Sequence, residues 1–489
     1  MNKECVNIVW FKRDLRLQDH KPLKFAEDAN EDYIMIYIFD PEIINYGDLS
    51  LIHHQFVFNS INQMNRSLKI NNRKVHIMYG ESYSVFKDLI KKFNVKKIFS
   101  YQESGIKITW SRDKQIKMLC LKNKVGWSEF ENQGVVRGLK NRVDWDKNWY
   151  NYVNVNLIDN KISKSNIKFE NIKFTFPHIL QKNIEKKRLN YQKAGEHNAF
   201  KILNSFINER VEDYGKNISS PEKSRLSCSR LSTYLSWGNI SLRQAYKYVN
   251  YNKNKISSKR SVNAFLARLK WRSHFIQKFE SNCNYENEFI NQGYKNMNFD
   301  HNNEFLKNWK EGKTGYPLVD ASMRCLIETG WINFRMRAMI VSFLCHHLNQ
   351  DWRNGIYYLA NLFLDYEPGI HYTQFQMQAG ITGINTIRIY NPIKQSMDHD
   401  SNGKFIKKWV PELKNLDSIS IHQPWKLKST IFNNINGLTN YPNPIVSPLI
   451  AIKKSRDQLW ALKKSKEVLK ESKKLIEIHV RPRKKLLKS

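Results

Sequence analysis

The sequence predicts an α/β domain followed by a nearly all-helical domain. The first hundred residues alternate short β-branched or apolar runs with amphipathic stretches, which is the rhythm of βαβ units. From about residue 195 the apolar residues recur with a period of 3.6, and strand-like runs become scarce. The chain also has 489 residues, more than one hydrophobic core usually organises. We therefore expect a Rossmann-like parallel sheet in the first domain and helices in the second.

Short apolar runs and longer amphipathic segments alternate in the first domain. The runs predict strands buried on both faces, and the segments predict helices. We expect strands over Val6–Phe11, Tyr33–Phe39, Val75–Met78 and Lys97–Tyr101, and helices over Leu51–Leu68 and Tyr83–Phe93. Ligands of such a sheet bind at the carboxyl ends of the strands, where WFKRDLRL and Asp40-Pro41 lie. No Gly-x-Gly-x-x-Gly motif follows the first strand, which argues against ordinary NAD binding.

Composition divides the rest of the chain. The residues after 134 lose periodicity and are rich in Asn and Lys, which indicates an inter-domain linker. The predicted boundaries are 1–134 for the α/β domain, 135–194 for the linker, 195–460 for the helical domain and 461–489 for a basic C-terminal helix and tail.

One predicted helix, Ser261–Glu280, has two different faces. Its first stripe is purely apolar and fits a core: Val262, Phe265, Leu266, Leu269, Ile276 and Phe279. Its second face carries Arg268, Trp271 and Phe275, and this mixture is harder to explain by burial alone.

The chain is strongly basic. Lys and Arg number 80 against 45 Asp and Glu, which gives a formal charge of +35. Such an excess is typical of proteins that bind a polyanion, and nucleic acid is the leading partner. Codon bias in an AT-rich genome also enriches Lys and Asn, so charge alone leaves the partner open.

Cysteine spacing and hydropathy exclude several classes of protein. The six cysteines form no Cys-x-x-Cys pair and no regular spacing, so neither a disulfide framework nor a metal site is expected. The N-terminus enters a strand-like run almost at once, and the sequence has no apolar stretch long enough for a membrane span. We therefore expect an intracellular protein that does not enter a membrane.

Two arginines fall where a helix begins. Asn333 is predicted to cap that helix, which puts Arg335 and Arg337 in its first turn. Cations there oppose the helix macrodipole by about 0.3 to 1 kcal/mol each, so an anionic partner explains them better than solvation does. Asp365 and Glu367, which lie at a helix end before a Pro-Gly turn, are candidate carboxylates.

Two further patterns in the helical domain carry weaker signals. Hydroxyls and arginines cluster in Ser224–Ser232; such a stretch at a helix start can cradle a phosphate, although it is more often a plain turn. Aromatic side chains also lie among arginines, at Trp271, Trp331, Trp352 and Tyr366. They can stack on unpaired bases, conduct electrons to a redox ring or simply fill the core.

An ordered series of motifs resembles the photolyase/cryptochrome family. WFKRDLRL, SRLSTYLSWGNIS, RLKWR, GKTGYPLVDASMR, DWRNG, RIYNPIKQS and FIKKWVPELK occur in family order at family-like spacing. The resemblance implies a helical domain that holds FAD, whose reduced anion, excited by light, donates an electron to a pyrimidine dimer. It also implies an antenna site in the α/β domain. The antenna chromophore and its presence stay open, because Thr109 stands where some members have a folate-binding Glu.

The resemblance also assigns roles to individual residues. The implied FAD-binding residues are Tyr214, Ser229, Arg230, Leu231, Ser232, Arg337, Asp365, Tyr366 and Glu367. Catalytic roles fall on Trp271, His371 and Trp352, and DNA contacts on Arg268, Trp271, Arg335 and Gln395. No residue is assigned to a metal. UV-damaged DNA is the implied partner, and we expect a cytoplasmic monomer that associates with the nucleoid through DNA.

Several positions depart from the family pattern. His371 replaces the Asn that usually faces the reactive flavin nitrogen, and Arg268 replaces a Glu that usually hydrogen-bonds the dimer. Of the three tryptophans that usually conduct electrons to the flavin, Trp352 is present, while Phe375 and Phe299 replace the other two. The usual electron path is therefore expected to be interrupted.

These departures leave several hypotheses of function open. Light-driven repair of cyclobutane dimers comes first, and repair of 6-4 photoproducts, which needs proton transfer, is suggested by His371. A signalling cryptochrome that binds FAD without repair is suggested by His371, Arg268 and the missing tryptophans, while the short C-terminal stretch RPRKKLLKS argues against it. A basic nucleic-acid-binding protein without a cofactor is disfavoured by the ordered motifs and by the pairing expected between Arg337 and Asp365.

Overall fold

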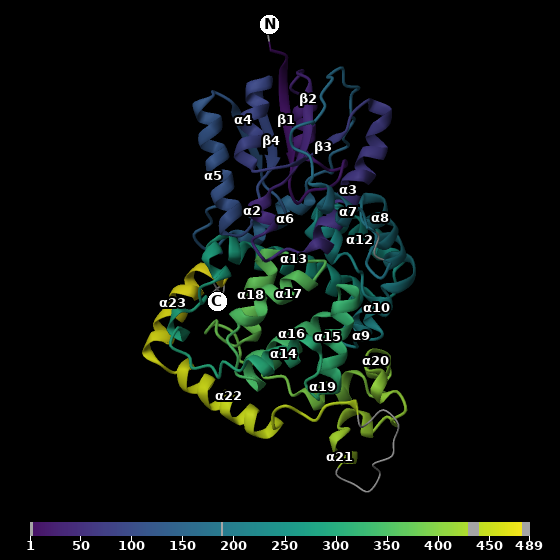
Figure 1. Cartoon of the computed structure of the whole chain (residues 1–489), viewed down its shortest axis with the longest axis vertical. Helices are drawn as coiled ribbons and strands as arrows, with labels where there is room; N and C mark the ends of the chain where they lie inside the picture. The colour runs from purple at the N-terminus through teal and green to yellow at the C-terminus, as the bar shows by residue number, and fades with distance from the viewer. Residues whose placement is uncertain (1–2, 187–188, 429–439, 482–489) are drawn as a thin grey trace, which may run out of the picture.

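The computed structural model describes residues 3–186, 189–428 and 440–481. An α/β domain lies at one end of the long axis of the molecule and a helical domain at the other (Figure 1). This arrangement confirms the fold class expected from the sequence.

The α/β domain is built on a five-stranded parallel sheet in the order β3-β2-β1-β4-β5. Its strands are β1 (Cys5–Phe11), β2 (Tyr33–Phe39), β3 (Val75–Tyr79), β4 (Asn94–Tyr101) and β5 (Gly126–Phe130). In the centre, Val9 pairs with Met35 on one side and Phe99 on the other. The four predicted strands are confirmed. The fifth, β5, was missed because it is a partly exposed edge strand with no continuous apolar run.

Helices cover both faces of the sheet. One face packs against α1 (Lys21–Glu27) and α3 (Leu51–Leu68), and the other packs against α4 (Ser82–Lys92) and α5 (Lys107–Lys122). A further short helix, α2 (Pro41–Ile44), begins at Asp40 directly after β2, and the Asp40 carboxylate accepts a hydrogen bond from a backbone N–H of its first turn. The loops at the carboxyl ends of the strands face the helical domain, so the predicted ligand edge lies at the contact between the two domains.

The stretch predicted as an irregular linker contains two helices. These are α6 (Trp145–Asn154) and α7 (His178–Glu185), and Trp149 is only 1% exposed. Its ring packs edge-to-face on Tyr246 of α12 (Leu242–Asn252) at a centroid distance of 5.5 Å. The predicted inter-domain linker therefore contains regular structure, because a few buried aromatics fix it despite its polar composition. The predicted domain boundaries stay a prediction.

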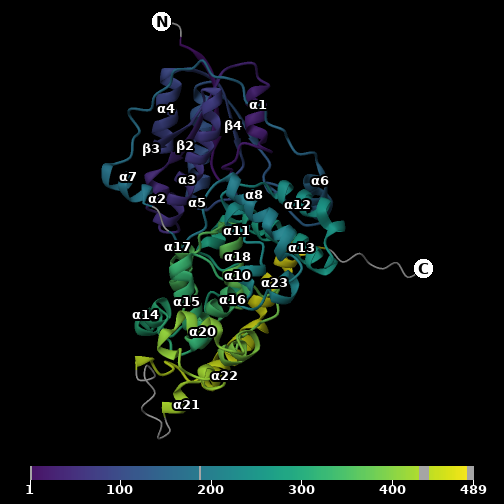
Figure 2. The ribbon, with the colours of Figure 1, turned by 90° about the vertical axis from the view of Figure 1, so that its right-hand side faces the viewer.

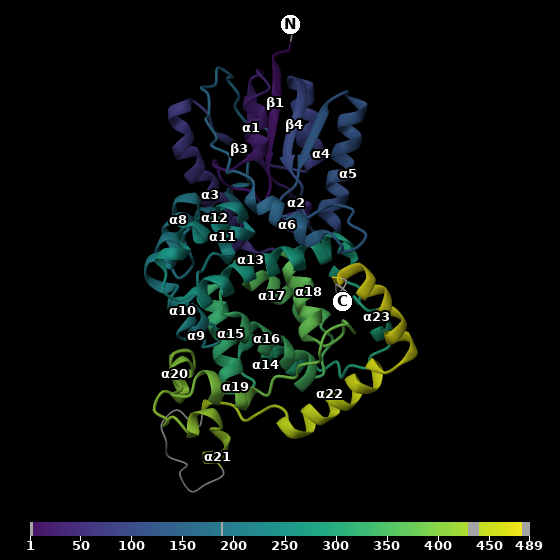
Figure 3. The same ribbon diagram turned by 180° about the vertical axis from the view of Figure 1, so that it is seen from behind.

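Helices make up the second domain. Besides α12, they are α8 (Glu196–Ser205), α9 (Tyr214–Asn217), α10 (Ser224–Ser227), α11 (Ser232–Ser236), α13 (Lys259–Glu280), α14 (Asn303–Glu311), α15 (Pro317–Thr329), α16 (Phe334–Ser342), α17 (Arg353–Leu362), α18 (Pro368–Gln378), α19 (Pro392–His399), α20 (Lys404–Trp409), α21 (Trp425–Lys428), α22 (Pro448–Lys463) and α23 (Lys466–His479). Viewed from behind, α6 and α12 lie beside α13 (Figure 3).

The long helix α13 packs against α18. The two backbones approach closely at Gly369, where a Cβ atom would come within 2.6 Å of the Ile276 Cα. The apolar stripe predicted for α13 faces the core, and Val262, Phe265 and Leu269 are fully buried. This packing fixes the other face of α13 against the site described below.

The two C-terminal helices run along the side of the helical domain (Figure 2). Leu459 of α22 and Val468 and Leu475 of α23 are buried, so these basic helices are held by apolar contacts. The basic tail predicted at the end of 461–489 falls, from residue 482 onward, outside the described residues. Among the helices of the described ranges, none is long and apolar enough to cross a membrane.

Candidate functional site

A cavity of about 810 Å³ lies inside the helical domain. Its walls come from α9, the loop between α10 and α11, α13, the start of α16, the α17–α18 connection, α18 and residues 384–390. Its volume lies within the range of roughly 300 to 1,000 Å³ typical of cofactor and ligand pockets. The cavity can therefore hold an organic cofactor.

The second face of α13 forms one wall of this cavity. Arg268, Trp271 and Phe275 all line it, which explains the mixed character of that face. Trp271 is 53% exposed, whereas Phe275 is buried and lies 5.8 Å from the Trp271 ring. An exposed indole beside a cavity offers a stacking surface to a planar ligand.

An ion pair between Arg337 and the buried Asp365 also lines the cavity. The Arg337 Nη2 donates to the Asp365 Oδ2 at 2.8 Å, and the Arg337 Nε donates to the backbone carbonyl of Ile332 at 3.0 Å. Burial alone would raise the pKa of Asp365, but the Arg337 charge and hydrogen bond outweigh it, so the pKa is lowered. The Asp365 Oδ1 is buried and has no hydrogen-bond partner within the described residues. The pair thus presents an open acceptor beside a fixed positive charge.

His371 also lines the cavity, and its imidazole is neutral. Its Nε2 is 2.8 Å from the backbone carbonyl of Ile356. A carbonyl can only accept, so Nε2 carries the proton and Nδ1 is left as an acceptor. Burial lowers the pKa of His371 to about 4, and the nearby Arg337 charge acts in the same direction. The side chain therefore acts as a dipole, not as an acid, near neutral pH.

Arginines dominate the charge of the cavity. Asp365 is the one carboxylate among the lining residues of the described chain. Six arginines line the cavity: Arg230, Arg268, Arg272, Arg335, Arg337 and Arg388. Asp365 pairs with Arg337, and Glu367 pairs with Arg272 at 2.7 Å. The other four form no ion pair with any carboxylate of the described residues. The cavity therefore favours an anion that carries more than one charge.

Part of the stretch predicted as a phosphate cradle, Ser224–Ser232, lines the cavity: residues 228–232 do so, up to the start of α11, whereas residues 224–227 form α10 outside it. Arg230 has a left-handed backbone, with φ at 59°, and its guanidinium lies 3.8 Å from the centre of the Trp331 ring. Burial and the neighbouring Arg225 lower the pKa of Arg230 to about 9. A cation held in this way is stabilised by an anion in contact with it.

Comparisons with known proteins match both domains. The family model described as DNA photolyase matches residues 7–140, and the model described as the FAD binding domain of DNA photolyase matches residues 265–461. Together they match more than half of the chain. The chain belongs to the photolyase/cryptochrome family.

The chain is similar, over about nine tenths of its length, both to proteins named as photo-lyases and to proteins named as cryptochromes. A deoxyribodipyrimidine photo-lyase of Alkalihalophilus pseudofirmus is 29% identical, over 91% of this chain and 96% of the relative. A cryptochrome DASH of Synechocystis is 28% identical, over 90% and 95%. Among solved structures, an archaeal photolyase from Sulfolobus tokodaii is 27% identical with a TM-score of 0.78, over 93% of this chain and 100% of that one. A bacterial class III photolyase from Agrobacterium tumefaciens shares the fold, with a TM-score of 0.82 at 23% identity over 95% and 99%.

Most of the cavity's lining comes from the region matched to the FAD-binding domain, 265–461, and the rest comes from residues 214–235, which precede that region. Most of the site residues predicted from the sequence line it: Tyr214, Ser229, Arg230, Leu231, Ser232, Arg268, Trp271, Arg335, Arg337, Asp365 and His371. The residues fit FAD, because unpaired arginines suit a diphosphate and the Arg337–Asp365 pair suits the polar edge of an anionic ring. The individual roles of these residues stay a proposal.

Four predicted site residues do not reach the cavity wall. The Tyr366 hydroxyl is instead bound to Asp48, and Glu367 is bound to Arg272 behind the wall. Trp352 is 1% exposed and packs on Phe289 at 5.9 Å. Gln395 lies on α19 outside the cavity. Direct contact of these four side chains with a ligand in the cavity is therefore not supported by their positions.

Two arginines on the cavity wall were missed in the sequence. Arg272 follows Trp271 in the motif RLKWR, and its burial on α13 required a carboxylate partner, which Glu367 supplies. Arg388 lies in the motif RIYNPIKQS, and no pattern in the sequence distinguishes it as a cavity residue.

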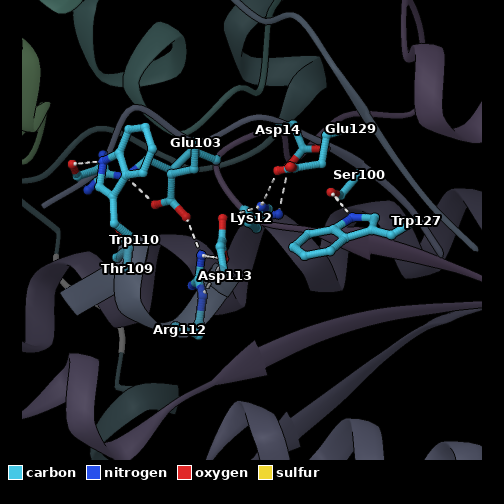
Figure 4. A network of polar contacts seen from close by, with 12 residues as sticks. Lys12, Asp14, Ser100, Glu103, Thr109, Trp110, Arg112, Asp113, Trp127 and Glu129 are labelled. Atoms are coloured by element: carbon cyan, nitrogen blue, oxygen red, sulfur yellow. Dashed lines mark hydrogen bonds and ion pairs between the residues drawn. The ribbon is translucent and has the colours of Figure 1, made fainter. Parts of the chain in front are cut away.

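A second, much smaller cavity of about 60 Å³ lies at the carboxyl ends of the strands. Ion pairs fill the space around it (Figure 4): the Lys12 Nζ lies 3.1 Å from Asp113, and the Arg112 Nη2 lies 2.7 Å from both Glu103 and Asp113. Thr109 also lines this cavity. Since a water molecule takes about 30 Å³ in the liquid, the space suits water, not an aromatic ring system.

Proposed function

We propose that this protein repairs UV-induced pyrimidine dimers in DNA as a deoxyribodipyrimidine photo-lyase, a carbon–carbon lyase. The observation that carries the proposal is the exposed Trp271 at a large cavity with four unpaired arginines. Such a wall offers both a stacking surface for two adjacent pyrimidines flipped out of one strand and charge for phosphates.

FAD is held by the inner part of the cavity in this proposal. Tyr214, the loop Ser229–Ser232 and Arg337 surround the cofactor, and Arg337 with Asp365 binds the polar edge of its ring system. Bound FAD supplies light absorption and the single electron that splits the dimer. The fixed Arg337 charge favours the reduced anionic form of the ring, because the opposite charge is already in place and needs no reorganisation.

DNA is held by the outer part of the cavity and the basic surface. The charge of +35 binds phosphates without sequence preference, with Arg268, Arg335 and Gln395 as proposed contacts. Trp271 stacks on the flipped dimer, a contact worth about 1 to 3 kcal/mol per base. A damaged pair flips at lower cost than an intact one, which selects the lesion.

Two alternative functions have specific observations behind them. His371 invites a test of 6-4 photoproduct repair, but its lowered pKa keeps the imidazole neutral near neutral pH, and its one ring proton is already donated to the Ile356 carbonyl. Arg268 and His371, at positions where repair enzymes of the family usually carry other residues, favour a light sensor that binds FAD without repair.

The second chromophore and the biological setting also stay proposals. The archaeal photolyase from Sulfolobus tokodaii was solved with two FAD molecules. A comparable antenna here requires movement of the ion-pair network around Asp113, because the cavity at the strand ends measures about 60 Å³. We expect the protein to act as a monomer on DNA in the cytoplasm.

The test is repair of a defined thymine-dimer oligonucleotide by the purified, chemically reduced protein, in matched light and dark samples. We expect light-dependent loss of the dimer, and we expect Trp271→Ala to abolish most of it. Trp460→Ala is the matched control, because Trp460 is 46% exposed on α22, away from the cavity. Flavin-loaded protein that leaves the thymine dimer intact in light would refute the proposal, and a parallel 6-4 substrate would then separate another repair specificity from a sensor.

A further inference from the structure

Four tyrosines form a continuous series of ring contacts that begins behind the cavity wall. His371, which lines the cavity, lies 5.4 Å from the rings of both Tyr366 and Tyr372. Tyr357 lies 6.5 Å from Tyr372, and Tyr46 lies 6.3 Å from Tyr357. All of these contacts are edge-to-face. The series runs from α18 through α17 to the loop after α2, in the other domain.

Buried carboxylates accompany this tyrosine series. The Tyr366 hydroxyl lies 2.8 Å from the Asp48 Oδ2, and the Tyr357 hydroxyl lies 2.9 Å from the Glu286 Oε1. Asp48 is 2% exposed and Glu286 is 1% exposed. Burial raises the pKa of Asp48 to about 6 and raises the pKa of Glu286 as well. Each acid is therefore a stronger base than a solvated carboxylate and lies within proton-transfer distance of a phenol.

The hydroxyls of the two inner tyrosines are also linked. They lie 3.1 Å apart. When Asp48 is ionised it can only accept, so the single Tyr366 proton goes to Asp48 and the Tyr372 hydroxyl donates to the Tyr366 oxygen. Both inner tyrosines thus have a route for their proton to the same carboxylate.

Exposure changes along the series. Tyr366 and Tyr372 are fully buried, whereas Tyr357 and Tyr46 are partly exposed. A reductant in solution can therefore reach the outer tyrosines but not the inner ones. By contrast, Trp352, the one tryptophan left of the usual electron path, is buried. The other two positions of that path are Phe375 and Phe299, and phenylalanine is much harder to oxidise than tyrosine.

We propose, resting on the FAD site proposed above, that this tyrosine series supplies electrons to oxidised FAD under blue light. First, Tyr366 or Tyr372 gives one electron to the photoexcited flavin, and its hydroxyl proton passes to Asp48. Tyr357 then gives one electron to the oxidised inner tyrosine and its proton to Glu286, while Asp48 returns the first proton.

The last steps bring the electron from solution. Tyr46, which is hydrogen-bonded to the Glu286 carboxylate, gives one electron to the oxidised Tyr357. Tyr357 regains its proton from Glu286, and Glu286 then accepts the Tyr46 proton. A thiol in solution then reduces Tyr46, which recovers its proton from Glu286, and the thiol proton goes to water. In sum, the thiol loses one electron and the flavin gains it.

The test is anaerobic photoreduction of the purified, flavin-loaded full chain with dithiothreitol as the thiol. Loss of the oxidised-flavin absorption band is followed under constant blue light, and flash-induced radicals are identified by electron paramagnetic resonance. We expect a tyrosyl signal in the unchanged protein, its loss in the Tyr366→Phe/Tyr372→Phe double variant, and loss of steady photoreduction in Tyr357→Phe. Tyr294→Phe is the control, because Tyr294 is equally buried, lies outside the series and has a hydroxyl with no hydrogen-bond partner among the described residues.

Each outcome separates this proposal from the one on which it rests. Flavin content, measured first on every variant, shows that the site is intact, and unchanged protein without flavin would overturn both proposals. Flavin-loaded double variant that photoreduces at the rate of unchanged protein would overturn the tyrosine series alone. Loss of photoreduction in Trp352→Phe, with the tyrosine variants unaffected, would also overturn it and assign the path to Trp352.

Discussion

The cavity in the helical domain and the strand-end pocket of the α/β domain are built from similar residues but in opposite ways. Both contain arginines, acids and aromatic rings. In the helical cavity four arginines lack a carboxylate partner among the described residues and about 810 Å³ is open, whereas at the strand ends the charges pair with one another and about 60 Å³ is left. A binding site for an anion is therefore indicated by cations without a carboxylate partner and by free volume, more than by the kinds of side chain present.

The largest effect is expected from breaking the closed network. Asp113→Ala removes the carboxylate shared by Lys12 and Arg112, which leaves Lys12 with only Glu129 at 4.0 Å and Arg112 with only Glu103. Removing one partner of a buried pair costs about 3 to 5 kcal/mol of folding free energy. Denaturant unfolding measures this loss, and the flavin content of the folded fraction is expected to stay unchanged. Loss of flavin from folded protein would show that the strand-end region holds the cofactor after all.

In the helical cavity, Arg337→Ala is expected to cost less folding free energy than Asp113→Ala but to lose more flavin. Arg337→Ala leaves the buried Asp365 carboxylate without its donor, at a cost of about 1 to 3 kcal/mol. The flavin-to-protein ratio after gel filtration is expected to fall steeply, because the charge beside the ring is gone. Arg324→Ala is the control, since the Arg324–Glu412 pair is partly exposed and remote from the cavity. Full flavin retention in Arg337→Ala would contradict the proposed cofactor position.

How far the sequence predicted these features differs between the two regions. Strand β2 and helix α3 were predicted to the residue because their apolar patterns are continuous, and the two faces of α13 were visible from its period. The positions of Tyr366 and Glu367 were not predictable, because each is turned from the cavity by a partner far away in the chain, Asp48 and Arg272. The small volume of the strand-end pocket likewise depends on ion pairs between residues from separate segments, and these pairs form only when the chain folds.

The unpaired arginines give a prediction for DNA binding. If Arg268 and Arg335 contact phosphates, each substitution by Ala should reduce the slope of log affinity against log salt by about 0.9. Fluorescence anisotropy with a dimer-containing oligonucleotide at several salt concentrations measures this slope. Arg112→Ala, in the closed network, should leave the slope unchanged. Equal slopes for all three variants would remove the distinction between paired and unpaired arginines.

The smallest expected effect concerns pH. The pKa of Asp365 is lowered in the folded protein by Arg337, so the stability contributed by this carboxylate is present above the pKa of an unfolded Asp, about 3.9. That contribution is lost as the pH falls through the lower folded value. The difference in unfolding free energy between unchanged protein and Asp365→Asn should therefore shrink below about pH 4. A difference that grows on acidification would contradict the ion pair.

The most direct test of the account is a single assay on one preparation: FAD content per chain, followed by loss of a thymine dimer in light after chemical reduction. We expect about one FAD per chain, light-dependent loss of the dimer and no loss in the dark. Protein with full FAD content that binds the dimer and leaves it intact in light would contradict the claim that the helical cavity is a repair site.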